Sequence, residues 1–303
     1  MSISHHAVPT RDGTTIEATV YRPASVRLTQ RLPIYISLHG GGFLFGTSRS
    51  EDAACSRVVV NLSPTLAVVV VNINYRHTPE HRYPRAWNDV EDAFDWVHRN
   101  LDAIGGDGDQ VVVGGISAGG QLAASLVLQQ HLGKLGGGAS ARPRIKGQVL
   151  TIPCLVSVDC YEGMLGRMAS PDVSSVKENE FAPVLPLSRM RMFTDLLQIE
   201  RQDAEDRRLN PGYATGHEVQ GMPPTVFGIA GLDPLRDEAL LYAKHLAENG
   251  VPTDVNLFRG VPHGFRRFGD SLSECKHWDS VIANGIRWTL SDPTAASFEI
   301  KTE

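Results

Sequence analysis

The chain has 303 residues, of which 42% are hydrophobic and 21% are charged, and its formal net charge is −5. This length suits one large domain with a sizeable core or two modest ones. The slightly acidic balance and the lack of a basic run argue against nucleic acid as a partner. No apolar run approaches the roughly 18 residues of a membrane span, and the polar N-terminal stretch does not resemble a secretory signal. We therefore expect a cytoplasmic protein without a membrane span.

Cysteine and histidine spacing bears on disulfides and metals. The cysteines are widely spaced and form no CxxC pair, which fits reduced thiols in a cytosolic protein; they are Cys55, Cys154, Cys160 and Cys275. The 11 histidines show no HExxH or other metal-ligand spacing. We expect no bound metal and no cofactor.

In chain order, the first predicted element is an antiparallel hairpin of residues 3–8 and 14–21 around the turn "RDG". Short apolar runs then predict six strands, at 33–38, 66–75, 110–116, 147–152, 225–231 and 254–258. Apolar residues at helical spacing predict helices over 87–101 and 234–250. Pro234 suits the first turn of the second helix, and Gly250 suits its C-terminal cap.

Strands that alternate with helices predict an α/β fold, with a mostly parallel sheet covered by helices on both faces. The glycine-rich stretch 131–144 is predicted to be a flexible surface connection.

Residues 156–214 interrupt this alternation, because they contain no convincing strand. They are predicted to form a helical insertion between two strands of the sheet. Two interpretations of its methionines remain open: they line an adaptable apolar pocket, or they pack inside the insertion's own small core. These residues are Met164, Met168, Met190 and Met192.

The stretch "VVVGGISAGGQLAASL" (111–126) predicts a nucleophile elbow, in which a strand turns sharply into a helix with a serine at the apex. Strand and helix crowd the positions two before and two after that serine, Ser117, and here both are glycine, Gly115 and Gly119. The helix N-terminus adds positive potential beside the reacting centre. The alternative is a tight turn with an idle serine.

A second motif, "HGGGFLFG" (39–46), follows a predicted strand. Its consecutive glycines leave backbone N–H groups unobstructed, and such groups stabilise the negative charge of a tetrahedral intermediate. The candidate oxyanion-hole donors are the amides of Gly41, Gly42 and Ala118. The alternative is a merely flexible loop. His39 is interpreted as a brace for this loop.

Two further residues complete a candidate triad in the order Ser…Asp…His. Asp233 and His263 each follow a predicted strand, at the edge where open α/β sheets bind ligands. His263 is predicted to take the serine proton, and Asp233 to orient its ring. Asp237 is the second candidate acid, although a helix-surface or loop-bracing role suits it better. The histidines of "NYRHTPEHRYP", His77 and His81, are interpreted as structural.

These motifs together resemble the hormone-sensitive-lipase-like branch of the α/β-hydrolases, over about residues 14–288. The resemblance rests on "HGGGF" (39–43), "YRHTPEHRYP" (75–84), "GISAGG" (115–120), "DPLRDE" (233–238) and "HGF" (263–265). It implies an esterase with a serine–histidine–aspartate triad, an oxyanion hole at the HGGG loop and a helical cap. The implied division is a catalytic core of 1–155 and 215–303 with a cap of 156–214.

The chain departs from the family pattern at two places. Ile116 stands before the serine, where an acidic residue or threonine is more common; no predicted proton transfer passes through it, so activity should survive. Family members also usually carry N-terminal helices that form part of the cap, whereas the hairpin here begins near residue 3. This predicts a more open acyl site, or one closed by a partner subunit.

The predicted function is hydrolysis of short-to-medium acyl esters, or of an ester in a natural product. The alternative is a non-hydrolytic, lyase-like or dehydratase-like reaction on the same scaffold. A small-molecule receptor is a third hypothesis, and the presence of both Ser117 and His263 argues against it. A homodimer is a possible assembly. The substrate pocket is predicted to include Phe43, Ile116, Met190 and Phe193.

Overall fold

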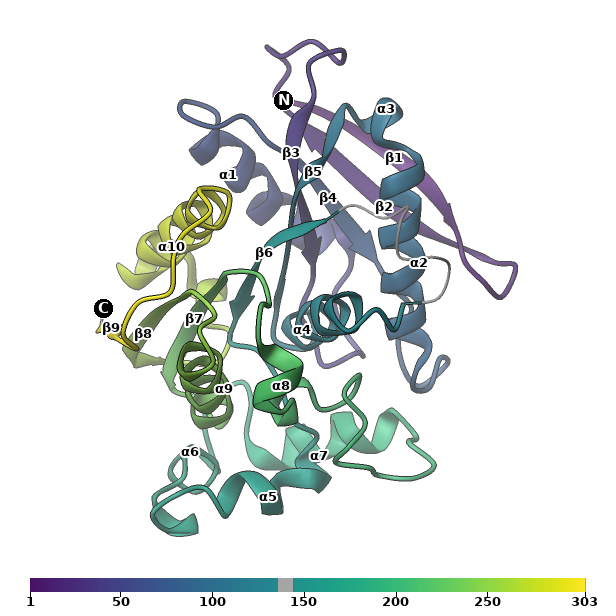
Figure 1. Cartoon of the computed structure of the whole chain (residues 1–303). Coiled ribbons are helices and arrows are strands. Elements are labelled where there is room, and N and C mark those ends of the chain that lie inside the picture. The colour runs from purple at the N-terminus through teal and green to yellow at the C-terminus, as the bar shows by residue number, and fades with distance from the viewer. Residues whose placement is uncertain (136–143, 303) are drawn as a thin grey trace.

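A nine-stranded sheet organises the computed structural model, which describes residues 1–135 and 144–302 (Figure 1). The strand order in the sheet is β1-β2-β4-β3-β5-β6-β7-β8-β9. Strands β1 and β2 form an antiparallel hairpin, β2 pairs antiparallel with β4, and the other pairs are parallel. The strands are β1 Ser2–Pro9, β2 Thr15–Arg22, β3 Leu32–Leu38, β4 Val69–Asn74, β5 Gly106–Ile116, β6 Ile145–Thr151, β7 Thr225–Leu232, β8 Thr253–Pro262 and β9 Ile300–Thr302.

The predicted α/β sheet with an N-terminal hairpin is confirmed, with differences at its ends. Strand β4 begins three residues later than the predicted run 66–75, and β9, which pairs with β8, was not predicted. The predicted helix 87–101 divides into α2 (Arg85–Arg99) and α3 (Leu101–Ile104). Part of the predicted flexible connection, residues 136–143, lies outside the described residues.

Helices cover both faces of the sheet (Figure 1). On one face lie α2, α4 (Ala118–His131) and α9 (Arg236–Glu248), and on the other lie α1 (Asp52–Leu62) and α10 (Glu274–Thr289). The central strand β5 contributes side chains to the cores on both faces of the sheet. Val111 and Val113 belong to the core beneath α2, α4 and α9. Val112 belongs to the core beneath α1 and α10. Alternate residues of a strand point to opposite faces, so a continuous valine run fits a strand buried on both sides.

Residues 156–214 contain short helices and no strand, all within the described chain. Figure 1 shows α5 (Tyr161–Leu165), α6 (Ser175–Glu178) and α7 (Leu187–Leu196) together beyond one end of the sheet, and α8 (Gly216–Val219) follows them. This segment has a buried cluster of its own around Tyr161, Met164 and Met190. At the N-terminus, residues 1–14 form β1 and a turn rather than a helix.

Candidate active site

Ser117 stands at the sharp turn between β5 and α4. Its backbone has φ 56° and ψ −117°, a strained conformation for a residue with a side chain. A Cβ at Gly115 would overlap the carbonyl oxygen of Gly119, and a Cβ at Gly119 would overlap the carbonyl oxygen of Leu38. The close approach of strand and helix therefore requires glycine at both positions, as the sequence predicted.

The end of strand β6 supports this turn. The Ser117 backbone N–H donates to the Thr151 carbonyl at 2.9 Å. The Thr151 hydroxyl in turn donates to the Gly115 carbonyl at 3.0 Å. These bonds fix the serine against a neighbouring strand, which holds its side chain above the end of the sheet.

The side chains of Ser117, His263 and Asp233 form one hydrogen-bonded chain. Ser117 Oγ lies 2.9 Å from His263 Nε2, and His263 Nδ1 lies 2.7 Å from Asp233 Oδ2. An ionised carboxylate only accepts hydrogen bonds, so Nδ1 carries the ring proton and Nε2 accepts from the serine hydroxyl. The structure thus brings together three residues that lie up to 146 positions apart in the sequence.

This chain of bonds is shielded from solvent. Asp233 is 1% exposed and His263 is 6% exposed. The second carboxylate oxygen of Asp233 accepts from the Leu235 backbone N–H at 3.0 Å, which fixes the carboxylate toward the histidine. A buried carboxylate held in this way orients an imidazole and stabilises its protonated form.

The backbone amides of Gly41, Gly42 and Ala118 lie beside Ser117, and their residues line the pockets that meet there. Among residues 1–135 and 144–302, no acceptor is hydrogen-bonded to these three N–H groups. The Gly41 carbonyl accepts from the amides of Leu44 and Phe45 at 3.2 and 2.9 Å, so the loop closes as a turn on its other side. The free donors are available to a ligand oxygen.

Residues 75–78 brace this glycine loop from behind. The ring of His39 stacks on Tyr75 with centroids 4.1 Å apart, and the Tyr75 hydroxyl donates to the His39 carbonyl at 2.7 Å. Thr78 donates to the Phe43 carbonyl through its backbone N–H and its hydroxyl. Burial lowers the pKa of His39 to about 4, so the ring is neutral near pH 7. His39 thus lies where a brace is expected.

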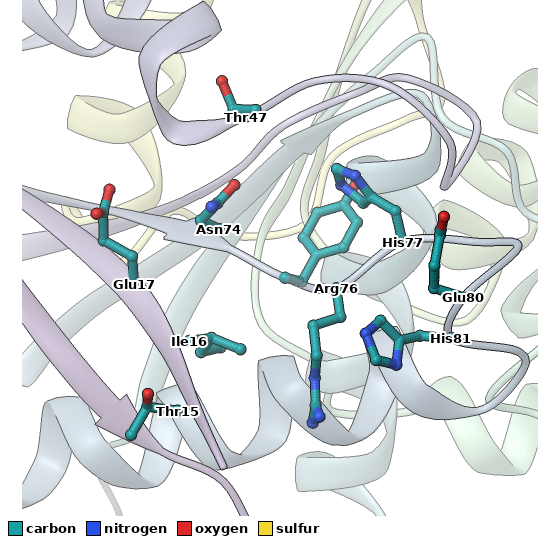
Figure 2. A pocket seen from close by; sticks show the side chains of 10 residues that line it. Thr15, Ile16, Glu17, Thr47, Asn74, Arg76, His77, Glu80 and His81 are labelled. Atoms are coloured by element: carbon teal, nitrogen blue, oxygen red, sulfur yellow. The ribbon is translucent and has the colours of Figure 1, made fainter.

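A separate hollow of about 380 Å³ lies on the far side of this brace. Figure 2 shows the side chains that line it. It is bordered by β2, by the end of β4 and by residues 75–81, with His77 and His81 on its wall. Arg76, which reaches through it, is held by Asp12 and Asp89. The hollow contains none of the three triad candidates.

Two pockets meet at Ser117. The smaller has a volume of about 50 Å³ and lies between α4 and residues 156–214. The larger, about 880 Å³, extends toward α1 and α10. Of the predicted pocket residues, Phe43 and Met190 line the smaller pocket, Ile116 lines the larger, and Phe193 lines both.

Both interpretations of the methionines hold, and Met190 fits both, because it lines the smaller pocket and belongs to the buried cluster within residues 156–214. Met190 lines the smaller pocket and Met192 the larger, although both belong to α7. Met164 is buried in the cluster within residues 156–214, and Met168 is half-buried outside both pockets. Phe43 mainly packs behind the glycine loop, where its ring stacks on Trp87 with centroids 4.8 Å apart.

The carboxyl groups that follow Asp233 anchor residues 156–214. Asp237 accepts from the Ser175 backbone N–H at 2.6 Å, so it braces a loop, and Asp233 is the acid on His263. Glu238, which the sequence analysis did not single out, is buried and accepts from the Leu155 N–H and the Tyr161 hydroxyl. Its position in "DPLRDE" was the available signal.

Glu238 predicts a pH effect on stability. Burial raises its pKa from 4.5 to about 8. The native state therefore holds a proton that the unfolded chain releases between these pH values, so this stabilisation is complete below pH 4.5 and is lost as the pH rises through 8. Between pH 5 and 9, the unfolding free energy of wild type relative to Glu238→Gln should fall by on the order of 4 kcal/mol. Urea unfolding of both proteins at each pH measures it, and a constant difference would contradict the raised pKa.

Ile116 is half-buried against the core beneath α1 and α10, and it lines the larger pocket. No hydrogen bond of the triad candidates involves its side chain. We expect Ile116→Asp to keep detectable esterase activity, reduced by roughly tenfold because a charge replaces an apolar pocket wall. Hydrolysis of p-nitrophenyl acetate measures this. Complete loss in a variant with wild-type circular dichroism would refute it, and Ile116→Val is the matched control.

Other features of the described chain bear on its surroundings. All four cysteines are free thiols. None of the helices in residues 1–135 and 144–302 is long and apolar enough to cross a membrane.

A model of the alpha/beta hydrolase fold family matches residues 35–267. An esterase structure from the archaeon Pyrobaculum calidifontis is 34% identical, with a TM-score of 0.79 over 96% of this chain and 87% of that chain. An ethyl acetate hydrolase of Pseudomonas putida is 30% identical, over 95% of this chain and 83% of that protein. The carboxylesterase NlhH of Mycobacterium tuberculosis is 32% identical, over 85% of this chain and 73% of that protein.

The match spans most of the chain, from within β3 to beyond the end of β8. A hydrogen-bonded triad and an amide-lined loop are typical of this family, and both arrangements occur here. The chain therefore belongs to the hormone-sensitive-lipase-like branch of the α/β-hydrolase family and is a carboxylic ester hydrolase.

Proposed function

We propose that this ester hydrolase works through a triad of Ser117, His263 and Asp233, and that its substrates are short-to-medium acyl esters. The observation that carries the proposal is the continuous hydrogen-bonded chain from Ser117 Oγ through the imidazole to the buried carboxylate. A serine hydroxyl is a weak nucleophile by itself, and a base at 2.9 Å activates it.

In the first half-reaction, Ser117 Oγ attacks the ester carbonyl carbon while its proton passes to His263 Nε2. Asp233 stabilises the imidazolium that forms. The carbonyl oxygen becomes negatively charged and accepts hydrogen bonds from the amides of Gly41, Gly42 and Ala118. The carbon–oxygen bond to the alcohol then breaks, and the proton on His263 passes to the departing alcohol oxygen.

In the second half-reaction, water attacks the acylated serine. His263 takes a proton from this water, and the same amides bind the oxyanion. The bond from the acyl carbon to Ser117 Oγ breaks, the proton returns from His263 to the serine, and the carboxylic acid leaves. Each donor in the oxyanion hole is worth about 10²–10³ in kcat in comparable enzymes.

We also propose the division into a catalytic core, 1–155 and 215–303, and a cap, 156–214. Residues of the proposed cap contribute to both pockets beside the serine, which supports its role in enclosing the substrate; three of them are Leu185, Met190 and Phe193. Asp237 and Glu238 of the core hold this segment by hydrogen bonds.

The ethyl acetate hydrolase among the relatives supports a short acyl group here. The free cysteines fit a reducing compartment, which supports a cytoplasmic location. The homodimer stays a prediction that a measurement of mass in solution tests.

Turnover of p-nitrophenyl esters, combined with covalent labelling, tests the proposal. The purified protein should hydrolyse p-nitrophenyl acetate or butyrate. A fluorophosphonate should abolish this activity, and peptide mass spectrometry should find the phosphonyl group on Ser117. Labelling of another residue, or full activity after complete labelling of Ser117, would overturn the assignment. A folded protein without turnover of any ester would favour the non-hydrolytic alternative.

A further inference from the structure

The two pockets at Ser117 differ in size and in lining. The smaller one, about 50 Å³, is lined mainly by apolar side chains, which include Leu185, Met190, Leu197, Leu209 and Leu235. The larger one, about 880 Å³, contains apolar walls and several charged groups. An ester has two halves on either side of its carbonyl carbon, so each half enters one pocket.

The position of His263 decides which half goes where. The histidine must deliver its proton to the alcohol oxygen, so the alcohol lies on the side of its Nε2. His263 belongs to the lining of the larger pocket. The smaller pocket does not include His263. Of the proposed oxyanion-hole residues, Ala118 borders only the smaller pocket, Gly41 only the larger, and Gly42 both. The acyl chain therefore enters the smaller pocket and the alcohol the larger.

The volumes then limit each half. A water-sized group needs roughly 10–15 Å³ of such space, so a pocket of about 50 Å³ holds only a few carbon atoms. Acetyl to butyryl groups fit, and longer chains exceed the space between its lining side chains, which include Met190 and Leu209. The larger pocket has more than ten times this volume, so it accepts a ring-sized alcohol.

The larger pocket also offers a hydrogen-bond acceptor. Arg57 and Arg266 both lie 2.8–2.9 Å from Asp279, so two guanidinium groups share one carboxylate. Glu51, at the start of α1, also lines the pocket. Arg57 acts on its carboxyl electrostatically, but no group in the described residues donates a hydrogen bond to it. A half-buried acceptor without a donor suits a hydroxyl of the ligand.

We propose that the enzyme removes short acyl groups, acetyl to butyryl, from bulky alcohols that carry a further hydroxyl group, which donates to Glu51. This inference rests on the proposed function, because it assumes attack by Ser117 and protonation of the alcohol by His263.

Two series of esters test the sizes of the pockets. With p-nitrophenol as the common leaving group, kcat/KM should fall at least tenfold from butyrate to octanoate. With acetate as the common acyl group, ethyl, cyclohexyl and menthyl acetates have alcohols of similar acidity, and their kcat/KM values should agree within about threefold. Equal rates for butyrate and octanoate, or a tenfold loss with menthyl acetate, would overturn the assignment.

Two methionines of α7 provide a matched pair. Met190→Ala enlarges the smaller pocket, so the ratio of octanoate to acetate kcat/KM should rise at least tenfold, as expected for added room of several methylenes. Met192→Ala enlarges the larger pocket and should leave this acyl ratio within twofold, whatever it does to individual rates. The opposite pattern would mean that the two halves are exchanged.

The role of Glu51 is tested with cyclohexyl acetate and the monoacetate of 1,4-cyclohexanediol. Wild type should prefer the hydroxylated ester about fivefold or more, and Glu51→Gln should reduce this preference. Glu80→Gln, in the separate hollow of Figure 2, is the control. Equal rates with both esters in wild type would refute the hydroxyl contact.

Absence of turnover with every ester would instead refute the proposed function, whereas turnover with a flat acyl profile would refute the pocket assignment alone.

Discussion

Replacing Ser117 with alanine is expected to lower kcat for p-nitrophenyl acetate by at least about 10⁴-fold. The serine provides the oxygen that forms the acyl-enzyme bond, and alanine leaves His263 without a proton to take. Catalysis that remains would come from the amides of the oxyanion hole acting on direct attack by water. The fold should persist, because the Ser117 side chain contacts the solvent-accessible pockets and its backbone bond to Thr151 does not depend on the hydroxyl.

Steady-state hydrolysis of p-nitrophenyl acetate and butyrate measures the loss, with circular dichroism as the check of folding. Ser280→Ala is the matched control, because Ser280 is exposed on α10 and, within the described residues, its hydroxyl bonds only to the Lys276 carbonyl of its own helix. The control should keep wild-type kcat. A folded Ser117→Ala protein with more than about 1% of wild-type activity would refute the nucleophile assignment.

The parts of the site that the sequence predicted depend on local rules. Gly115 is required by a contact with Gly119 within a single strand–turn–helix unit, so the spacing of the two glycines is visible in five consecutive letters. Asp233 and His263 could be placed because parallel strands end at the same edge of a sheet. Residues that directly follow two such strands are therefore expected to lie close together. The same rule placed the glycine loop after β3 beside the elbow.

Other parts depend on contacts between distant segments. Met190 and Met192 are two positions apart on one helix, and only the packing of α7 against the core decides which pocket each one lines. Apart from its place in "DPLRDE", Glu238 resembles an ordinary surface carboxyl, because its burial depends on Leu155 and Tyr161, about 80 positions away. Strand β9 was missed because it is short and exposed, and its pairing with β8 alone makes it a strand.

Gly119→Ala is expected to have the second largest effect, on stability and activity together. The added methyl group would overlap the carbonyl oxygens of Leu38 and His39, which are backbone atoms that cannot rotate away. Overpacking of this kind costs about 1–3 kcal/mol, occasionally more, and we expect about 3 kcal/mol because two carbonyl groups must move. Leu38 and His39 lead directly into the glycine loop, so relief of the clash displaces the amides of Gly41 and Gly42 from Ser117.

A displacement of about 1 Å at a catalytic group costs about 10²-fold in rate. The folded fraction of Gly119→Ala should therefore lose about 10²-fold in kcat, with a smaller change in KM, because the oxyanion contacts strengthen in the transition state. Urea unfolding measures the stability, and active-site titration with a fluorophosphonate counts the folded enzyme. Gly260→Ala is the control, since a Cβ there meets nothing within 4 Å. Wild-type kcat in Gly119→Ala would mean that the loop and the elbow move together, and the amides of the loop would then keep their positions relative to the serine.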